Sequence, residues 1–354
     1  MKTMIVILFT LLGIILVSCT PIPSPTLTPT RTTLPTKTPT PTPTATITLS
    51  PTPTAIPLHP AGKVHFHESN ENIQYNWFSY LPARISKEEP LYIWVNSVNG
   101  FYPPSDDYKS FTDEARLWIN DSRQPATSNN LVSLIPIIPR PSTNHVYAVA
   151  FDWKVFLPSS DPFVQHPEKQ VNLMIDKLID DLSHDGYNVQ DKVFIEGFSA
   201  GCMFAQRYTI IHPERVKAMA GEQCGGSLVM PFQEIDGEKV NWPLGINDFE
   251  SLLGFQFDEG SYKEVPHFIY IGDKDVNNST FLFWGPGELW KSWGQINKLK
   301  RLFGELEPEI IENQVEYLIE NGFPLFEYKI YSGVSHRYTL EMQNDAKLFF
   351  NQFK

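Results

Sequence analysis

The stretch from Val193 to Pro213, VFIEGFSAGCMFAQRYTIIHP, combines three local signals that decide the fold. A short apolar run predicts a buried strand over 193–195, and small and apolar residues at helical spacing predict a helix over 202–211. Between them, residues 197–201 (GFSAG) fit the pattern G-x-S-x-G. A serine at the tip of a tight turn between a strand and a helix is the context in which this pattern indicates a nucleophile.

The two glycines of this pattern, Gly197 and Gly201, have a physical reason. A strand and a helix that approach each other closely leave no room for side chains there, and the turn holds Ser199 in a strained backbone conformation. The N-terminus of the following helix offers N–H groups and the positive end of the helix dipole, where a developing oxyanion is stabilised. We therefore expect Ser199 to be the nucleophile.

On these residues the chain resembles the α/β-hydrolase superfamily, in particular secreted esterases and polyester depolymerases of the polyhydroxybutyrate type. The resemblance covers about the last four-fifths of the chain, from the strands near Ile73 onward. It implies an α/β fold with a mostly parallel central sheet of about eight strands, helices on both faces, and a triad in the chain order Ser, acid, His.

The rest of the chain alternates strand and helix patterns, as an α/β protein requires. Strands are predicted at 64–67, 73–81, 91–95, 216–220, 267–271 and 326–331. Helices are predicted at 108–120, 168–184, 287–306, 308–321 and 340–350. Two runs, 131–138 and 146–151, compete for one further strand, and we favour the first because the second precedes a long loop.

The base of the implied triad is a histidine that follows the acid in the chain. Six of the nine histidines precede Ser199 and are excluded by that order: His59, His65, His67, His145, His166 and His184. His212 ends the helix after the serine, and His267 begins a strand that precedes the best acid. His336 remains, in the loop directly after the last predicted strand, and is expected to be the base.

The acid is expected after the strand HFIYI, in the loop GDKDV at 272–276. The family pattern at this place resembles G-x-x-D followed by an apolar residue, which selects Asp275. Asp273 is then expected to be a turn residue that caps its own backbone. In the implied mechanism His336 removes the proton of Ser199, which attacks an acyl carbon, and water later hydrolyses the acyl-enzyme. The acid holds the imidazole in the correct tautomer.

The oxyanion hole of this superfamily uses two backbone N–H donors. The resemblance assigns one to Ala200 and the other to the loop after the strand LYIWV. Many relatives carry His-Gly-Gly there, whereas this chain has NSVNG at 96–100. Backbone donors do not depend on side-chain identity, so we expect the second donor to be Val98 or Ser97.

Residues 225–265 lie where this fold accommodates a small cap over the active site. They include the aromatic residues Trp242, Phe249, Phe255, Phe257 and Tyr262. Two interpretations are open: these side chains line an acyl or aryl pocket, or they pack the insertion onto the domain. A second group after the acid allows the same two interpretations: Trp284, Trp290 and Trp293.

The first residues, 1–19, have the layout of a secretory signal. Lys2 is positively charged, and 4–17 form an apolar run that is short for a spanning helix. The end of the run resembles a bacterial lipobox, in which Cys19 is lipidated and becomes the mature N-terminus. The alternative is an uncleaved N-terminal anchor. Both predict a protein outside the cytoplasm that is attached to the cell membrane.

Residues 20–60 contain twelve prolines and fifteen threonines among 41 residues. A segment with so little apolar surface and so much proline is predicted to be a disordered, extended stalk. Its threonines are either O-glycosylated or simply solvated. Either way, the stalk would hold the remaining domain, 61–354, away from the membrane.

The domain at 61–354 carries 25 basic and 40 acidic residues, a formal charge of −15. A field of this sign argues against a nucleic-acid partner and against docking on anionic lipid. Its two cysteines, Cys202 and Cys224, are an even pair in an exported protein. A disulfide between them is permitted, and two buried free thiols are the alternative.

No metal-binding, dinucleotide-binding or phosphate-loop motif is present in the sequence. We therefore predict no metal and no cofactor. The predicted function is a membrane-tethered serine hydrolase of carboxylic esters, either small-molecule or polymeric. The alternatives are a serine peptidase with the same triad and a catalytically silent binding module on a stalk.

Overall fold

The computed structural model describes most of the predicted domain. The described residues are 57–97, 130–139, 148–151, 153–158, 161–224, 227–275 and 289–354, with a few positions between 109 and 119. All of them belong to one compact unit, Ala55–Lys354. The predicted signal and nearly all of the stalk lie outside the described residues, so the domain boundaries of the chain stay predictions. None of the helices in the described part is long and apolar enough to cross a membrane.

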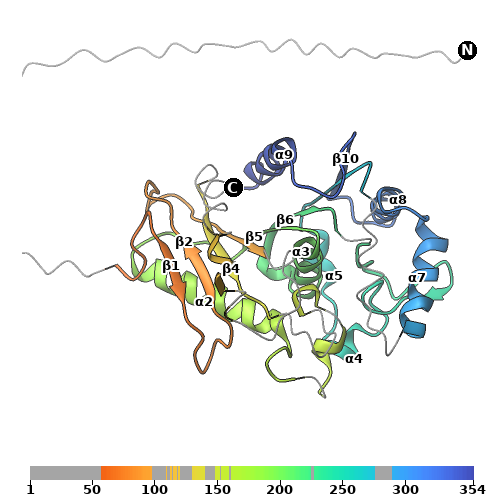
Figure 1. The fold of residues 1–354 in the computed structure, drawn as a ribbon, viewed down its shortest axis with the longest axis horizontal. Coiled ribbons are helices and arrows are strands. Elements are labelled where there is room, and N and C mark those ends of the chain that lie inside the picture. Colours follow the sequence, from red (N-terminus) through yellow and green to blue (C-terminus); the bar gives the residue numbers. More distant parts are fainter. Residues whose placement is uncertain are drawn as a thin grey trace, which may run out of the picture. The chain divides into compact units, whose positions relative to one another are not determined.

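The unit is built around an eight-stranded sheet (Figure 1). From one edge to the other its strands are β1 (Val64–His67), β2 (Trp77–Tyr80), β4 (Val132–Pro136), β3 (Ile93–Ser97), β5 (Val193–Phe198), β6 (Val216–Glu222), β9 (His267–Gly272) and β10 (Phe326–Tyr331). β2 is antiparallel to both β1 and β4, and all pairs from β4 to β10 are parallel. The predicted mostly parallel sheet of about eight strands is confirmed.

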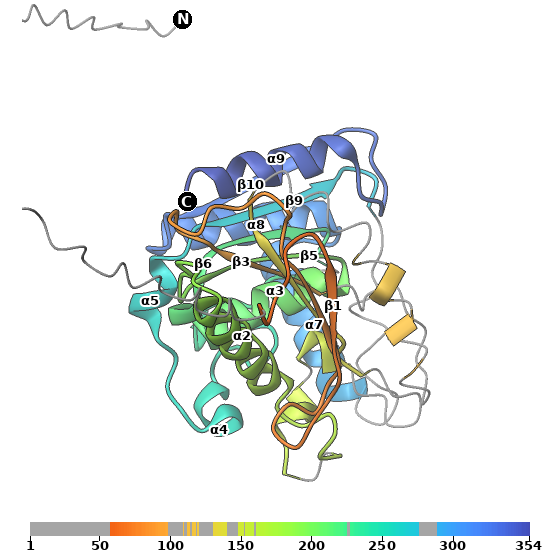
Figure 2. The same ribbon diagram turned by 90° about the vertical axis from the view of Figure 1, so that its left-hand side faces the viewer.

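Helices cover both faces of the sheet. They are α2 (Pro167–His184), α3 (Ala200–Ile211), α7 (Leu289–Phe303), α8 (Glu307–Glu320) and α9 (Leu340–Asn351). Successive side chains of β5 point to opposite faces: Val193 and Ile195 join the core cluster of α2, α3 and α8, whereas Phe194 joins the cluster of α9. Figure 2 shows α9 on one side of the sheet and α2 and α3 on the other.

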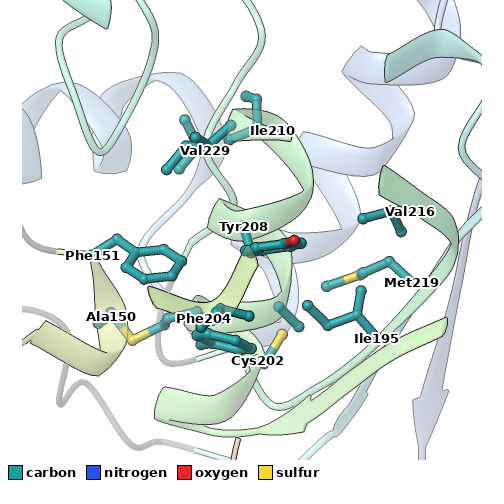
Figure 3. Packing of buried hydrophobic residues seen from close by; sticks show 14 of the residues in the cluster. Ala150, Phe151, Ile195, Cys202, Phe204, Tyr208, Ile210, Val216, Met219 and Val229 are labelled. Carbon is teal, nitrogen blue, oxygen red and sulfur yellow. The ribbon is translucent and has the colours of Figure 1, made fainter. Parts of the chain in front are cut away.

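The central helix α3 is buried along its whole length. Figure 3 shows its side chains Phe204 and Tyr208 between Phe151 on one side and Ile195 and Met219 on the other. A helix that is buried on all sides is part of the core. The turn of Ser199 at its N-terminus therefore rests on a rigid base.

Most predicted elements match the observed ones to within a few residues. β4 occupies the favoured run 131–138, and the competing run contains a short 3₁₀ helix, Ala148–Ala150. β2 begins at Trp77, later than predicted. The backbone N–H of Ile73 donates to the side chain of Asn70, and that of Gln74 donates to the side chain of Gln170 in α2, so neither pairs with a neighbouring strand. The predicted helix 108–120 lies largely outside the described residues.

The insertion at 225–265 packs onto the domain. It contains the two-stranded sheet of β7 (Glu234–Ile235) and β8 (Glu238–Lys239) and the short helices α4 (Phe249–Leu253) and α5 (Glu259–Lys263). Three of its aromatic side chains are buried in the core: Trp242, Phe249 and Tyr262. The indole N–H of Trp242 donates to the carbonyl of Phe151 at 2.9 Å. These contacts support the packing interpretation for the three, whereas the second tryptophan group has its side chains outside the described part.

Candidate active site

Ser199 lies at the tip of the turn between β5 and α3. Its backbone has φ 55° and ψ −116°, a conformation that residues other than glycine rarely adopt. Its N–H donates to the carbonyl oxygen of Glu222, at the end of β6, over 2.8 Å. A Cβ at position 197 would overlap the backbone of Gly201, so this close approach requires Gly197. The surrounding backbone thus holds the serine in a strained, projecting position.

Three side chains form a hydrogen-bonded chain where parallel strands end. Ser199 follows β5, Asp275 follows β9 and His336 follows β10. The Oγ of Ser199 lies 3.0 Å from Nε2 of His336, and the Nδ1 of His336 lies 2.8 Å from Oδ2 of Asp275. The Asp275 side chain is fully buried, and the His336 side chain is 25% exposed. An ionised carboxylate can only accept, so Nδ1 donates to Asp275 and leaves Nε2 to accept from the serine hydroxyl.

The loops that carry the histidine and the acid are fastened to each other. The carboxylate of Asp273 accepts from the N–H of Gly333 at 2.7 Å and from the hydroxyl of Ser332 at 3.0 Å. The N–H of Lys274 donates to the carbonyl of Val334 at 2.9 Å. The sequence predicted that Asp273 caps its own backbone, whereas its side-chain bonds go to the histidine loop. That partner lies about sixty residues further along the chain, which local turn chemistry cannot indicate.

No family model and no curated protein matches the sequence. Among solved structures, poly(aspartic acid) hydrolase-1 from Sphingomonas sp. KT-1 is 16% identical and superimposes with a TM-score of 0.52, covering 82% of this chain and 98% of its own. This chain has the α/β-hydrolase fold.

Two other solved structures are similar over comparable lengths. One is a poly(3-hydroxybutyrate) depolymerase from Bordetella parapertussis, with 18% identity, a TM-score of 0.48, and coverage of 82% of this chain and 91% of its own. The other is an S-formylglutathione hydrolase from Agrobacterium tumefaciens, with 16% identity, a TM-score of 0.44, and coverage of 82% and 95%. At such identities the similarity concerns the fold, and the chemistry must be argued from the site.

Two of the three predicted oxyanion donors, Ala200 and Ser97, belong to elements that adjoin the turn of Ser199 in this α/β-hydrolase fold. Ala200 is the first residue of α3, so its N–H has no acceptor within the helix. Ser97 is the last residue of β3 and pairs with Gly197 of β5, at the edge of the sheet where the turn begins. Val98 lies outside the described residues. Ala200 follows Ser199 in the chain and Ser97 pairs with Gly197, whereas the role of either as an oxyanion donor, and the choice between Ser97 and Val98, stay predictions.

Cys202 and Cys224 form a disulfide, with Cα atoms 4.8 Å apart. The bond joins the first turn of α3 to the segment after β6. A Cβ at position 221 would overlap the Sγ of Cys202 and crowd that of Cys224, so Gly221 makes room for the bridge. The bridge fixes α3 against the end of the neighbouring strand β6.

A buried carboxyl group lies in β5, three residues before Ser199. Glu196 of β5 is only 6% exposed. Its Oε1 accepts from the hydroxyl of Tyr338 at 3.0 Å and from that of Tyr270 at 3.2 Å. Its Oε2 accepts from the indole N–H of Trp94 at 3.0 Å. Burial raises the pKa of Glu196, although the hydrogen bonds that it accepts lower it.

A second buried acid, Glu222, ends β6 and is fully buried. Neither of its carboxyl oxygens has a hydrogen-bond partner among the described residues. Burial, with a smaller contribution from the charges of Glu196 and Asp275, raises the pKa of Glu222 to about 10. Neither glutamate was predicted from the sequence to belong to the site. A signal was present, because each is an acidic residue in a strand of mostly apolar and small residues, VFIEGF and VKAMAGE.

We expect Glu222→Gln to stabilise the protein at alkaline pH. The pKa of Glu222 is higher in the folded than in the unfolded chain, so unfolding releases a proton above about pH 4.5, and the free energy of unfolding falls as the pH rises toward 10. Glutamine keeps the shape and does not titrate. The variant should gain about 1–3 kcal/mol over wild type at pH 8.

This gain is measured by urea unfolding at pH 5 and pH 8. Glu320→Gln, on the exposed end of α8, is the control and should leave the difference between the two pH values unchanged. Equal pH dependence in wild type and Glu222→Gln would show that Glu222 is ionised in the folded protein.

Two further observations on the described residues concern ligand binding. No group of three or more His, Cys, Asp or Glu side chains among them could hold a metal ion. A hollow of about 490 Å³ lies in the 225–265 insertion, where Phe232, Phe249 and Phe257 contribute to its walls. None of the three residues of the hydrogen-bonded chain lines it.

Proposed function

We propose that the domain is a serine hydrolase that cleaves carboxylic esters through an acyl-enzyme. The observation that carries this proposal is the hydrogen-bonded chain from Ser199 through His336 to Asp275, at distances of 3.0 and 2.8 Å. A serine hydroxyl becomes an effective nucleophile when an adjacent base takes its proton and a third group orients that base. The α/β-hydrolase fold supports the proposal, because the chain order Ser, Asp, His is the order used by its hydrolases.

The proposed reaction proceeds in two halves. The Oγ of Ser199 attacks the ester carbon while its proton passes to Nε2 of His336, which then gives this proton to the leaving alkoxide. The acyl group is now bonded to the serine oxygen. A water molecule loses a proton to the same Nε2 and attacks the acyl carbon. The bond from that carbon to Oγ then breaks, Nε2 returns the proton to Oγ, and the carboxylic acid leaves. Asp275 stays ionised throughout and stabilises the imidazolium.

The negative charge that develops on the carbonyl oxygen needs preorganised donors. The N–H of Ala200, at the positive end of the α3 dipole, is the first proposed donor. The second comes from the end of β3, through Ser97 or Val98. Loss of one such donor typically lowers kcat about 10²–10³-fold, so the oxyanion hole is expected to contribute strongly to the rate.

Labelling with a fluorophosphonate probe tests the proposal. The probe reacts only with an activated serine, and mass spectrometry of the labelled full-length protein should find the adduct on Ser199. A panel of p-nitrophenyl esters and of peptide p-nitroanilides then separates ester from amide chemistry. Cleavage of anilides without esters would indicate a peptidase. A folded protein that is neither labelled nor active would support a binding module instead.

We further propose that a lipid on Cys19 attaches the protein to the outer face of a bacterial membrane. The short apolar run at 4–17, which ends two residues before this cysteine, supports the proposal because it has the layout of a secretory signal. A lipid there would anchor the protein, since each buried CH₂ of an acyl chain adds about 0.8 kcal/mol of membrane affinity. In a bacterial expression host, Cys19→Ala is expected to abolish incorporation of a clickable fatty acid. Equal incorporation in wild type and variant would contradict the proposal. The partners are then the membrane and an ester substrate.

A further inference from the structure

One fully buried side chain, that of Gln223, spans from the end of β6 to the loop that carries His336. Its Nε2 donates to the carbonyl oxygen of Ser335 at 3.0 Å and to that of Arg337 at 3.2 Å. These two carbonyls belong to the residues immediately before and after His336. The amide group has two N–H donors, and each carbonyl takes one of them.

The backbone of Gln223 is itself fixed. It has a φ of 48°, in the left-handed region, and its N–H donates to the carbonyl of Tyr270 in β9 at 2.8 Å. A left-handed residue other than glycine persists only where its surroundings impose it. The side chain therefore starts from a rigid point of the sheet rather than from a mobile loop.

The neighbours of Gln223 in the chain hold the serine. The carbonyl of Glu222 accepts from the N–H of Ser199, and Cys224 is bonded to Cys202 in the first turn of α3. Residues 222–224 thus contact the nucleophile turn at two points and the histidine loop at a third. This segment is a short mechanical link between the two groups that must exchange a proton.

The histidine loop needs such a link. Ser335 and Arg337 are exposed, so the loop is not held by burial of its own side chains around the histidine. Side-chain bonds also hold its two ends, from Asp273 to Gly333 and from Tyr338 to Glu196. Gln223 anchors the part between them. A change of about 1 Å in the position of a catalytic group can cost about 100-fold in rate.

We infer that Gln223 is a positioning residue, which sets the distance between Nε2 of His336 and Oγ of Ser199 by binding the two carbonyls beside the histidine. The expected fall in kcat rests on the proposed function. The expected loosening of the histidine loop does not. The sequence did not predict this role of Gln223, because a glutamine directly after a strand belongs to no recognisable motif.

The test replaces Gln223 by Met in the full-length protein. Methionine has a similar length and volume and lacks the two donors. The kcat for p-nitrophenyl butyrate should fall about 100-fold with little change in KM, because the substrate contacts are retained and the proton transfer is misaligned. The downfield proton resonance of the hydrogen bond between His336 Nδ1 and Asp275 should broaden or disappear.

Gln314→Met is the matched control. Gln314 of α8 is also fully buried, and its amide also makes two bonds to backbone, both to Leu228. Its replacement should cost similar stability and leave kcat and the downfield resonance unchanged. Gln223→Asn is a second variant that keeps the left-handed backbone favourable while the shorter amide no longer reaches both carbonyls. If Gln223→Met is too unstable to assay, the expected loss of activity is measured in Gln223→Asn.

The outcomes separate this inference from the proposed function. If wild type hydrolyses the ester and both Gln223 variants stay within a factor of about two of its kcat, the inference is wrong. If wild type is inactive, the proposed function is wrong. Amide hydrogen exchange then tests whether Gln223 holds the histidine loop. Faster exchange of residues 332–339 in the Gln223 variants than in Gln314→Met supports it, and equal exchange overturns it.

Discussion

Ser199→Ala is expected to lower kcat for an activated ester by about 10⁵–10⁶-fold, and His336→Ala by a similar factor. Without Oγ no acyl-enzyme forms, and without the imidazole the hydroxyl 3.0 Å away has no base to take its proton. The residual rate would come from the oxyanion donors and from substrate binding. Because the two residues act as one unit, the double variant should be no slower than either single variant.

Steady-state kinetics with p-nitrophenyl butyrate measure these losses, with thermal unfolding to show that each variant is folded. His184→Ala is the control, because this histidine is exposed at the end of α2 and should be dispensable. A Ser199→Ala variant that retains most of the wild-type kcat would show that the hydrolysis has another origin. It would also exclude the proposed acyl-enzyme.

Asp275→Asn is expected to lower kcat by about 10⁴-fold with the fold intact. The asparagine amide can present an N–H to Nδ1 and so stabilise the wrong tautomer of His336, which leaves Nε2 protonated and unable to accept from the serine. The loss is large because the Asp275 carboxylate is fully buried and lies 2.8 Å from Nδ1.

Asp273→Asn is the matched control two residues away. The side-chain carbonyl oxygen of the new asparagine can still accept from the N–H of Gly333, so the histidine loop keeps its first anchor and kcat should fall by no more than about tenfold. Parallel kinetics of the two variants measure the difference. Comparable losses at both positions would mean that the two aspartates share the role, and a larger loss in Asp273→Asn would assign the acid to Asp273.

Strong local signals made most of the fold predictable from the sequence. The apolar run before GFSAG and the alternating strand and helix patterns predicted the parallel sheet, which the structure confirms. The order Ser, acid, His and the pattern of the acid loop, both implied by the resemblance to α/β-hydrolases, then selected Asp275 and His336 as partners of Ser199. Such order is informative because parallel strands bring their carboxyl ends to one edge of the sheet, so residues 199, 275 and 336 can meet there.

Element boundaries and the burial of individual side chains were harder to predict from the sequence. The backbone just before β2 bonds to the side chain of Asn70 rather than to a neighbouring strand, and the burial of Trp242 depends on a carbonyl of Phe151 that lies far away in the chain. The two acids Glu196 and Glu222 lie in mostly apolar strands, and only the packed sheet showed that their hydrogen bonding differs. One accepts three hydrogen bonds, and the other accepts none from the described residues.

The sequence by itself determined the strand and helix pattern and the serine turn, because periodicity and tight-turn chemistry are local properties of the chain. The expected order of the acid and the histidine came from the resemblance to α/β-hydrolases. Only the tertiary structure decided how those groups are held. The bonds from Asp273 to the histidine loop, from Gln223 to the carbonyls beside His336 and between Cys202 and Cys224 each join segments that the chain separates. Such contacts depend on the distances between folded elements, and no local pattern in a single sequence records them.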